Sequence, residues 1–203
     1  MNRLLLTLIL IASIISSANA QGNGYEPGSM VANFTLKNVN DKQVSLADYK
    51  SAKGFIIVFT CNTCPYAKAY EQRIIDLHNK YAAKGFPVVA INPNDPAASP
   101  GDSFAAMQER SKSKKYPFPY LSDPDQQVTK RFGATRTPHI YLVSKTNGGN
   151  KVEYIGAVDS DTEDNDAEKI RYVENAIQAL LERKSPATKL TKAVGCTIKW
   201  KKG

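Results

Sequence analysis

The sequence of 203 residues predicts an α/β domain with a central mixed β-sheet, helices on both faces, an N-terminal β extension and a basic C-terminal tail. Two continuous runs of β-branched and aromatic residues, at 55–60 and 86–91, are typical of buried parallel strands. The stretch at 65–84 repeats apolar residues at helical spacing, and it can supply the crossover that parallel strands need. The turn sequence Asn-Gly-Gly-Asn at 147–150 then predicts an antiparallel hairpin.

The remaining elements follow in chain order. Short alternating segments at 31–36 and 43–46 predict the N-terminal β extension. Pro65 favours the first turn of the first long helix, and Gly85 is expected to end it. Asp102 is expected to cap a second helix. Further along, we expect an irregular stretch at 114–124, a short helix at 125–132, strands at 139–143 and 151–157, and a closing helix at 167–183.

Residues 1–20 have the composition of a secretory signal peptide. Arg3 gives a positive start, residues 4–15 form an apolar run, and Ala18-Asn19-Ala20 matches a signal-peptidase site. We therefore expect cleavage after Ala20 and a periplasmic or secreted protein. The alternative is an uncleaved N-terminal anchor.

The positive charge of the chain is concentrated in its tail. The formal net charge is +8, but residues 184–203 hold six lysines and no acidic residue, so the domain expected at 21–183 is close to neutral. A basic tail can contact anionic lipid or nucleic acid. For an exported chain we expect instead a solvated tail, packed on or near the domain. No nucleic-acid partner and no stable membrane insertion after removal of the leader are expected.

The motif Cys-Asn-Thr-Cys at 61–64 lies between the strand at 55–60 and the helix that begins at Pro65. This junction brings two sulfurs close enough to form and break a disulfide, and the positive end of the helix dipole favours a thiolate. Cys61 is nearest the strand, so we expect it to be the exposed nucleophile. Cys64 would be the more buried thiol that resolves the mixed disulfide. A structural disulfide and part of a zinc site are the alternatives.

A further set of motifs is spread in order over nearly all of the mature chain. They are Phe34-Thr35-Leu36, Val44-Ser45-Leu46, Phe59-Thr60-Cys61-Asn62-Thr63-Cys64-Pro65-Tyr66, Ala90-Ile91-Asn92, Asn94-Asp95-Pro96, Tyr116-Pro117-Phe118-Pro119-Tyr120-Leu121, Gly133-Ala134, Thr137-Pro138 and Gly195-Cys196-Thr197-Ile198-Lys199-Trp200-Lys201. In these motifs the sequence resembles the peroxiredoxin-like branch of the redoxin (AhpC/TSA) group in the thioredoxin superfamily.

The resemblance implies a thioredoxin-like fold and assigns roles to particular residues. Pro138 would be a cis-proline packed against the cysteine pair, although an ordinary trans proline at a strand start is the alternative. The catalytic residues would be Cys61, Cys64 and Pro138, and the supporting residues Thr60, Pro65, Arg136 and Thr137.

Two departures from the family pattern bear on the activity. Peroxiredoxins carry Pro-x-x-x-Thr/Ser-x-x-Cys around the peroxidatic sulfur. Upstream of Cys61 the hydroxyl position is occupied by Val58, and upstream of Cys64 it is occupied by Cys61, so neither cysteine has the pattern. Relatives often carry a cysteine where this chain has Arg136. We expect its fixed positive charge to lie beside the cysteine pair and to favour a thiolate.

Cys196 is the odd cysteine of the chain, and it lies in an apolar part of the tail. An unpaired cysteine is noteworthy in an exported protein. We expect it to be buried as a small hydrophobic residue. The alternative is a third redox thiol that pairs with Cys61 or Cys64.

Together these features predict an exported thiol–disulfide oxidoreductase that needs no cofactor or metal. Its partners would be a disulfide in a protein or small molecule and an upstream thiol reductant. One alternative is a thiol-dependent peroxidase that uses the same cysteines. Another is a non-enzymatic copper(I) protein, with Cys61, Cys64 and His139 as ligands.

Overall fold

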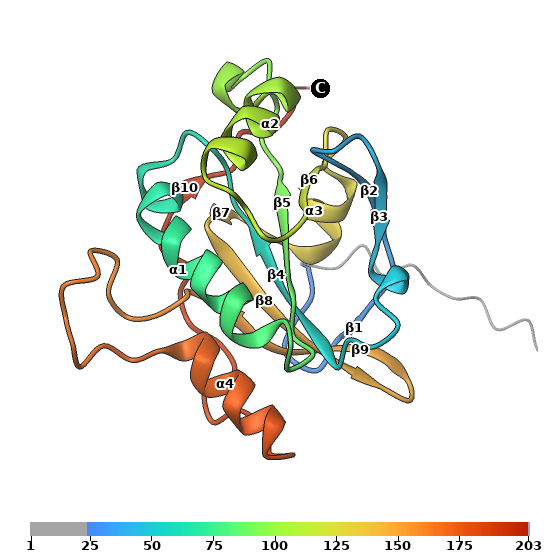
Figure 1. Cartoon of the computed structure of the whole chain (residues 1–203), viewed down its shortest axis with the longest axis vertical. Helices are drawn as coiled ribbons and strands as arrows, with labels where there is room; N and C mark the ends of the chain where they lie inside the picture. The colour runs from blue at the N-terminus through green and yellow to red at the C-terminus, as the bar shows by residue number, and fades with distance from the viewer. Residues whose placement is uncertain (1–23, 203) are drawn as a thin grey trace, which may run out of the picture.

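The computed structural model describes residues 24–202, so the expected signal peptide and its cleavage site lie outside the described residues. These residues contain an eight-stranded mixed sheet with the strand order β1-β9-β8-β4-β5-β6-β2-β3 (Figure 1). The parallel strands are β4 (Gly54–Phe59), β5 (Val88–Asn92) and β6 (Tyr120–Ser122), and the antiparallel hairpin is formed by β8 (His139–Thr146) and β9 (Gly149–Gly156). The α/β class, the mixed sheet and the hairpin are confirmed.

The N-terminal β extension is divided between the two edges of the sheet. β1 (Met30–Val31) pairs with β9 at one edge. β2 (Thr35–Asn38) pairs with β6 and with β3 (Gln43–Ser45) at the other edge. The single strand expected at 31–36 is therefore wrong, because the chain crosses between the edges there and buries Phe34 in the core.

Helices cover both faces of the sheet. Within the described residues they are the 3-10 turns η1 (Leu46–Asp48) and η2 (Pro100–Asp102) and the α-helices α1 (Pro65–Tyr81), α2 (Phe104–Ser113), α3 (Gln127–Phe132) and α4 (Tyr172–Leu181). Helices α1 and α4 pack on one face through residues such as Ile74 and Ile177, and α3 packs on the other through Phe132 (Figure 1). Because both faces are covered, β4 and β5 are buried along their whole length.

Several predicted helix boundaries are wrong. The first long helix ends at Tyr81, and a turn at Gly85, whose φ of +97° suits glycine, leads into β5. The closing helix begins at Tyr172 rather than near residue 167. Helix α2 is capped by Ser103, whose hydroxyl accepts a backbone amide, so Asp102 is not its cap.

The basic tail lies against the domain rather than extending from it. β10 (Cys196–Thr197) pairs antiparallel with β7 (Arg136–Thr137), a two-residue strand that neither periodicity nor composition predicts. Ile198 follows and is buried against the α3 side of the core. All six tail lysines are exposed, so their charges remain hydrated.

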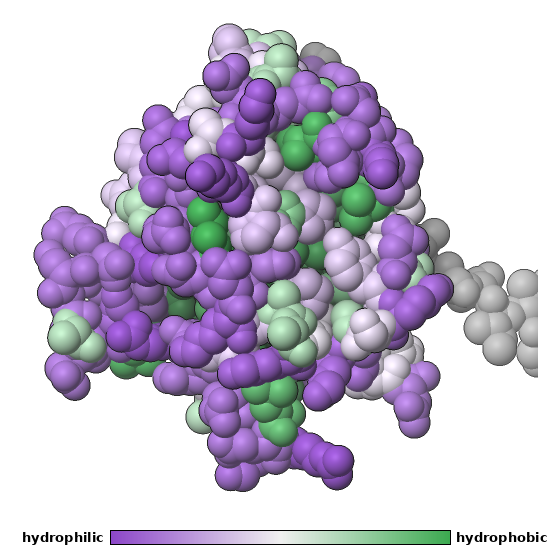
Figure 2. Space-filling view, viewed as in Figure 1, coloured by the Kyte–Doolittle hydropathy of each residue, from purple (hydrophilic) through white to green (hydrophobic). Residues whose placement is uncertain are grey.

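The polar surface agrees with a hydrophobic core that lies between the sheet and the helices that cover it. Figure 2 shows a face dominated by hydrophilic side chains, with hydrophobic ones in small separate groups. No helix within residues 24–202 is long and apolar enough to cross a membrane.

Candidate active site

Cys61 and Cys64 lie where the sequence predicts, between the end of β4 and the start of α1. Thr60 continues the pairing of β4, since its amide donates to the carbonyl of Ile91 at 2.9 Å. Cys64 is the N-cap residue of α1, and Pro65 is its first residue. Proline suits this position because its missing amide hydrogen would have no acceptor inside the helix. The loop is therefore fixed from both the strand and the helix.

Cys64 is joined by a disulfide to Cys196, with the two Cα atoms 5.9 Å apart, and Cys61 is a free thiol. We expect Cys61 and Cys64 to be the redox pair and Cys196 to be unpaired; the structure shows instead the alternative for Cys196, in which it pairs with Cys64. The reason is the tail strand, which places Cys196 opposite Thr137. The amide of Cys196 also donates to Sγ of Cys64 at 3.3 Å.

Thr137 contacts both sulfurs of the motif. Its Oγ1 lies 3.2 Å from Sγ of Cys61, and its carbonyl oxygen lies 3.1 Å from Sγ of Cys64. The peptide bond between Thr137 and Pro138 is cis, as the resemblance implies. Cys61, Cys64 and Cys196 pack together in one cluster, so three sulfur-bearing side chains meet at the edge of β7.

Both cysteines of the motif are buried. Cys61 is 5% exposed and Cys64 is 3% exposed. The exposed nucleophile that we expect at Cys61 is therefore not found. Cys196 of the tail is partly buried and packs against the same cluster.

The side chain of Arg136, whose charge we expect beside the cysteine pair, makes its hydrogen bond to the tail. This side chain is exposed and donates to the hydroxyl of Thr197 at 3.1 Å. Successive residues of a strand point to opposite faces, so Thr137 faces the sulfurs and its neighbour does not. Arg136 therefore belongs to the tail contact.

Asp102, for which the sequence predicts only a helix-capping role, is part of the site. Its carboxylate is 3% exposed and accepts the amide of Asn62 at 2.6 Å and the hydroxyl of Thr63 at 2.7 Å. Ser99 and Asn94 donate to it as well, at 2.6 and 2.9 Å. The two residues between the cysteines are thus fixed by one buried carboxylate.

The hydrogen bonds determine the charge of this carboxylate. Burial opposes ionisation of Asp102, but the donors Ser99, Asn94, Thr63 and the amide of Asn62 outweigh burial and hold its pKa below the ordinary value of 3.8. Because the amide of Asn62 is used in this way, it is directed at Asp102 rather than at the sulfur of Cys61.

Tyr120 is a second buried side chain that contacts the loop between the two cysteines. Its hydroxyl donates to the side-chain oxygen of Asn62 at 3.0 Å. Burial, followed by the neighbouring charges of Tyr116, Cys61 and Asp102, raises the pKa of Tyr120 well above 10.0. The phenol is therefore a permanent donor, and it holds Asn62 in place.

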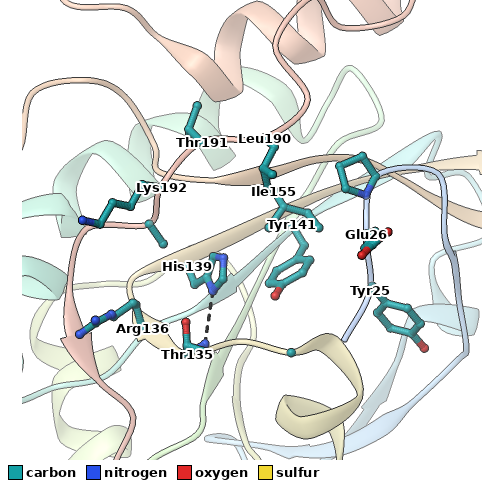
Figure 3. Close-up of a pocket in the computed structure, with 13 residues that line it drawn as sticks. Tyr25, Glu26, Thr135, Arg136, His139, Tyr141, Ile155, Leu190, Thr191 and Lys192 are labelled. Atoms are coloured by element: carbon teal, nitrogen blue, oxygen red, sulfur yellow. Dashed lines mark hydrogen bonds between the residues drawn. The ribbon is translucent and has the colours of Figure 1, made fainter. Parts of the chain in front are cut away.

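A cavity of about 660 Å³ lies beside β7, between the sheet and the tail. Figure 3 shows His139 and Tyr141 lining it from the sheet and Leu190 and Lys192 from the tail. His139 accepts the amide of Thr135 at 3.4 Å, and burial lowers its pKa to about 4. No cysteine lines the cavity, which makes it a neighbour of the sulfur cluster and not part of it.

The copper(I) alternative needs Cys61, Cys64 and His139 to converge. Within residues 24–202 no group of three or more Cys, His, Asp or Glu side chains is arranged to hold a metal ion. His139 faces the cavity and Tyr141, and Cys64 is bonded to Cys196. The described residues therefore give this alternative no support.

Comparisons with known proteins agree with the fold and the cysteine chemistry. The AhpC/TSA family matches residues 27–155. A solved structure of a conserved protein from Geobacillus kaustophilus has 35% identity and a TM-score of 0.80, over 89% of this chain and 95% of that chain.

Two curated relatives carry named activities. The thiol-disulfide oxidoreductase ResA of Bacillus subtilis is 26% identical over 141 residues, which are 70% of this chain and 74% of that protein. The chloroplastic peroxiredoxin Q of Triticum aestivum is 29% identical over 106 residues, which are 52% of this chain and 45% of that protein. The chain belongs to the AhpC/TSA family of the thioredoxin superfamily and is a thiol-based oxidoreductase of that family.

Proposed function

We propose that the protein is an exported thiol–disulfide oxidoreductase in which Cys61 and Cys64 exchange disulfides with a partner molecule. The observation that carries the proposal is the sulfur cluster itself. A free Cys61 and a bonded Cys64 both contact Thr137, the residue before the cis-proline Pro138. A free thiol beside an intramolecular disulfide is the arrangement from which exchange proceeds without any cofactor.

The reaction on a reduced enzyme follows from the order of the cysteines. The Cys61 thiolate attacks one sulfur of a substrate disulfide, so a mixed disulfide forms and the first substrate thiolate leaves. The Cys64 thiolate then attacks Sγ of Cys61, which releases the second substrate thiol and forms the disulfide between Cys61 and Cys64. Two electrons have passed to the substrate, and an upstream thiol reductant has to return them.

Residue roles follow from the contacts. Thr137 orients both sulfurs, with its hydroxyl on Cys61 and its carbonyl on Cys64. Pro138, Thr60 and Pro65 fix the backbone on either side of the cluster. The name of the ResA relative supports exchange with a disulfide as the reaction. Export is supported by the leader-like composition of residues 1–20.

Reduction of insulin by dithiothreitol tests the proposal. The wild-type protein is expected to accelerate precipitation of the insulin B chain, and Cys61→Ser is expected to abolish the acceleration. Ser185→Ala, an exposed change in the tail, is the matched control and should keep the wild-type rate. An unchanged rate of insulin precipitation with Cys61→Ser would contradict the proposal.

Thiol-dependent peroxide reduction is the second candidate. The hydroxyl of Thr137, 3.2 Å from the free thiol of Cys61, supports it, as does the match to peroxiredoxin Q. The residue Val58 at the hydroxyl position of the peroxidatic pattern opposes it. Consumption of hydrogen peroxide well above the rate of a free thiol would favour this candidate over disulfide exchange.

A further inference from the structure

Residues 192–197 form a strap that crosses the sulfur cluster and is anchored at both ends. At the N-terminal end, Lys189 and Thr191 bond to the backbone of Ile155 at 3.0 and 2.9 Å. The hydroxyl of Thr191 also accepts the amide of Ala157 at 3.0 Å. This end of the strap is therefore attached to β9.

The other end is attached to the loop after β5 and to the residue before α3. The amide and carbonyl of Lys199 bond to Asn94 and to the amide of Asp95, at 2.9 and 2.8 Å. Gln126 accepts the amide of Lys201 at 2.9 Å. Ile198 is 3% exposed and fills the core beside these bonds. None of these anchors involves a cysteine.

Between its anchors the strap lies directly on Thr137. A Cβ atom at Gly195 would overlap the carbonyl carbon and oxygen of Thr137, so only glycine permits this approach. The next residue, Cys196, pairs with Thr137 in the β7–β10 ladder and forms the disulfide with Cys64. The close approach at Gly195 therefore sets the distance between Cys196 and Cys64.

We propose that the strap is a built-in resolving arm, in which Cys196 takes over the disulfide from Cys61 and Cys64, and that Gly195 is its positioning residue. This inference rests on the proposed function, because it describes how that function restores the Cys61 thiol. The arrangement in the structure is then the end point of the relay, with Cys61 free and Cys64 bonded to Cys196.

The relay step is balanced within the chain. The Cys196 thiolate attacks Sγ of Cys64 in the Cys61–Cys64 disulfide. The bond between Cys64 and Cys196 forms, the bond between Cys61 and Cys64 breaks, and Cys61 leaves as a thiolate. No electrons enter or leave the protein, so the disulfide has been transferred from Cys61–Cys64 to Cys64–Cys196. An external thiol reductant, such as the dithiothreitol of the assay, then reduces Cys64–Cys196.

The two anchors explain why Cys196 can compete with external thiols. A thiol held at both ends of a short segment has a high effective concentration at its target, on the order of millimolar or more. Because the anchors are hydrogen bonds of the backbone, some of them to side chains, together with buried Ile198, the strap should stay in place when the disulfide is reduced. The resolving thiol thus remains beside Cys64 through the whole cycle.

Time-resolved mapping of the disulfides tests the relay. Reduced protein is mixed with one equivalent of 4,4′-dithiodipyridine and quenched in acid at intervals. Free thiols are then alkylated, and the disulfide-linked peptides are identified by mass spectrometry. In the wild-type protein we expect Cys61–Cys64 first and its conversion into Cys64–Cys196. In Cys196→Ser, oxidation should stop at Cys61–Cys64.

Gly195→Ala should slow the conversion by about tenfold or more, because the added methyl group lifts the strap from Thr137. Gly148→Ala is the matched control, since its Cβ meets nothing closer than 3.8 Å, and it should convert at the wild-type rate. Wild-type conversion in Gly195→Ala, or Cys64–Cys196 without prior Cys61–Cys64, would overturn the relay. The oxidant needs no protein substrate, so failure of the insulin assay alone would overturn the proposed function and not the relay.

Discussion

The amide of Asn62, the residue directly after Cys61, donates a 2.6 Å hydrogen bond to the buried carboxylate of Asp102. The same carboxylate accepts the hydroxyl of Thr63, so one side chain holds both residues between the cysteines. Bonds to an ionised acceptor are stronger than those to a neutral one. The shape of the cysteine loop therefore depends on a residue 40 positions away in the sequence.

Replacing Asp102 by asparagine is expected to destabilise the fold and slow disulfide exchange. Asparagine has one acceptor oxygen where aspartate has two, so some of the groups that donate to Asp102 lose their acceptor. The substitution also removes the negative charge. We expect a loss of about 3 kcal/mol in the free energy of unfolding. Urea unfolding measures it, with Asp76→Asn, an exposed change on α1, as the control within about 0.5 kcal/mol of wild type. Equal stability of the two variants would contradict the anchoring role.

Low pH should lower the free energy of unfolding through protonation of the same carboxylate, Asp102. The pKa of Asp102 in the folded state lies below 3.8, so its contribution is present above that pH and is lost as the pH falls through the folded pKa. The urea midpoint of the wild-type protein should drop steeply below pH 4, and that of Asp102→Asn should drop less. Parallel curves for the two proteins would show that other carboxylates cause the acid loss.

The lowered pKa of His139 should cause a separate change in the free energy of unfolding between pH 7 and pH 5. Burial lowers its pKa to about 4, whereas the unfolded chain binds the proton near 6.5. Over this interval the unfolded state binds more protons, so stability falls with falling pH, by about 2 kcal/mol at pH 5. Urea unfolding of His139→Gln should lack this decrease. The interval lies above the range in which Asp102 titrates, so the two effects are separable.

The disulfide between Cys64 and Cys196 should stabilise the fold, because it closes a loop with a sequence separation of 132. Cys61→Ser removes the competing partner and leaves this disulfide alone. We expect the free energy of unfolding of its oxidised form to exceed that of the form reduced by dithiothreitol by about 3 kcal/mol. Identical urea midpoints for the two forms would mean that the anchors alone fix the tail.

The sequence predicts those parts of the fold that depend on local pattern. The buried strand before Cys61, Pro65 at the first position of α1 and the hairpin turn are encoded within short windows of residues. The cis bond before Pro138 came from the family resemblance, since local pattern does not distinguish cis from trans. The class of site was therefore predictable from a few adjacent residues and one distant proline.

The connections across the site were not predictable in the same way. Pairing of Cys196 with Cys64 depends on a two-residue ladder, which has no periodicity to detect. Asp102 precedes a helix, and acidic residues in that place are usually caps. The available signal was the run of polar residues at and after the end of β5, namely Asn92, Asn94 and Asp102, because β5 runs parallel to the strand that ends near Cys61.

One kinetic comparison tests the central claim most directly. Fully reduced protein is mixed, in parallel rapid-quench experiments, with a protein disulfide and with hydrogen peroxide, and the loss of the Cys61 thiol is followed by alkylation and mass spectrometry. Disulfide exchange at Cys61 predicts a rate with the disulfide that is about a hundredfold or more above that of free cysteine, and a rate with peroxide no faster than a free thiol. Fast loss of the thiol to peroxide, with the disulfide inert, would contradict the account.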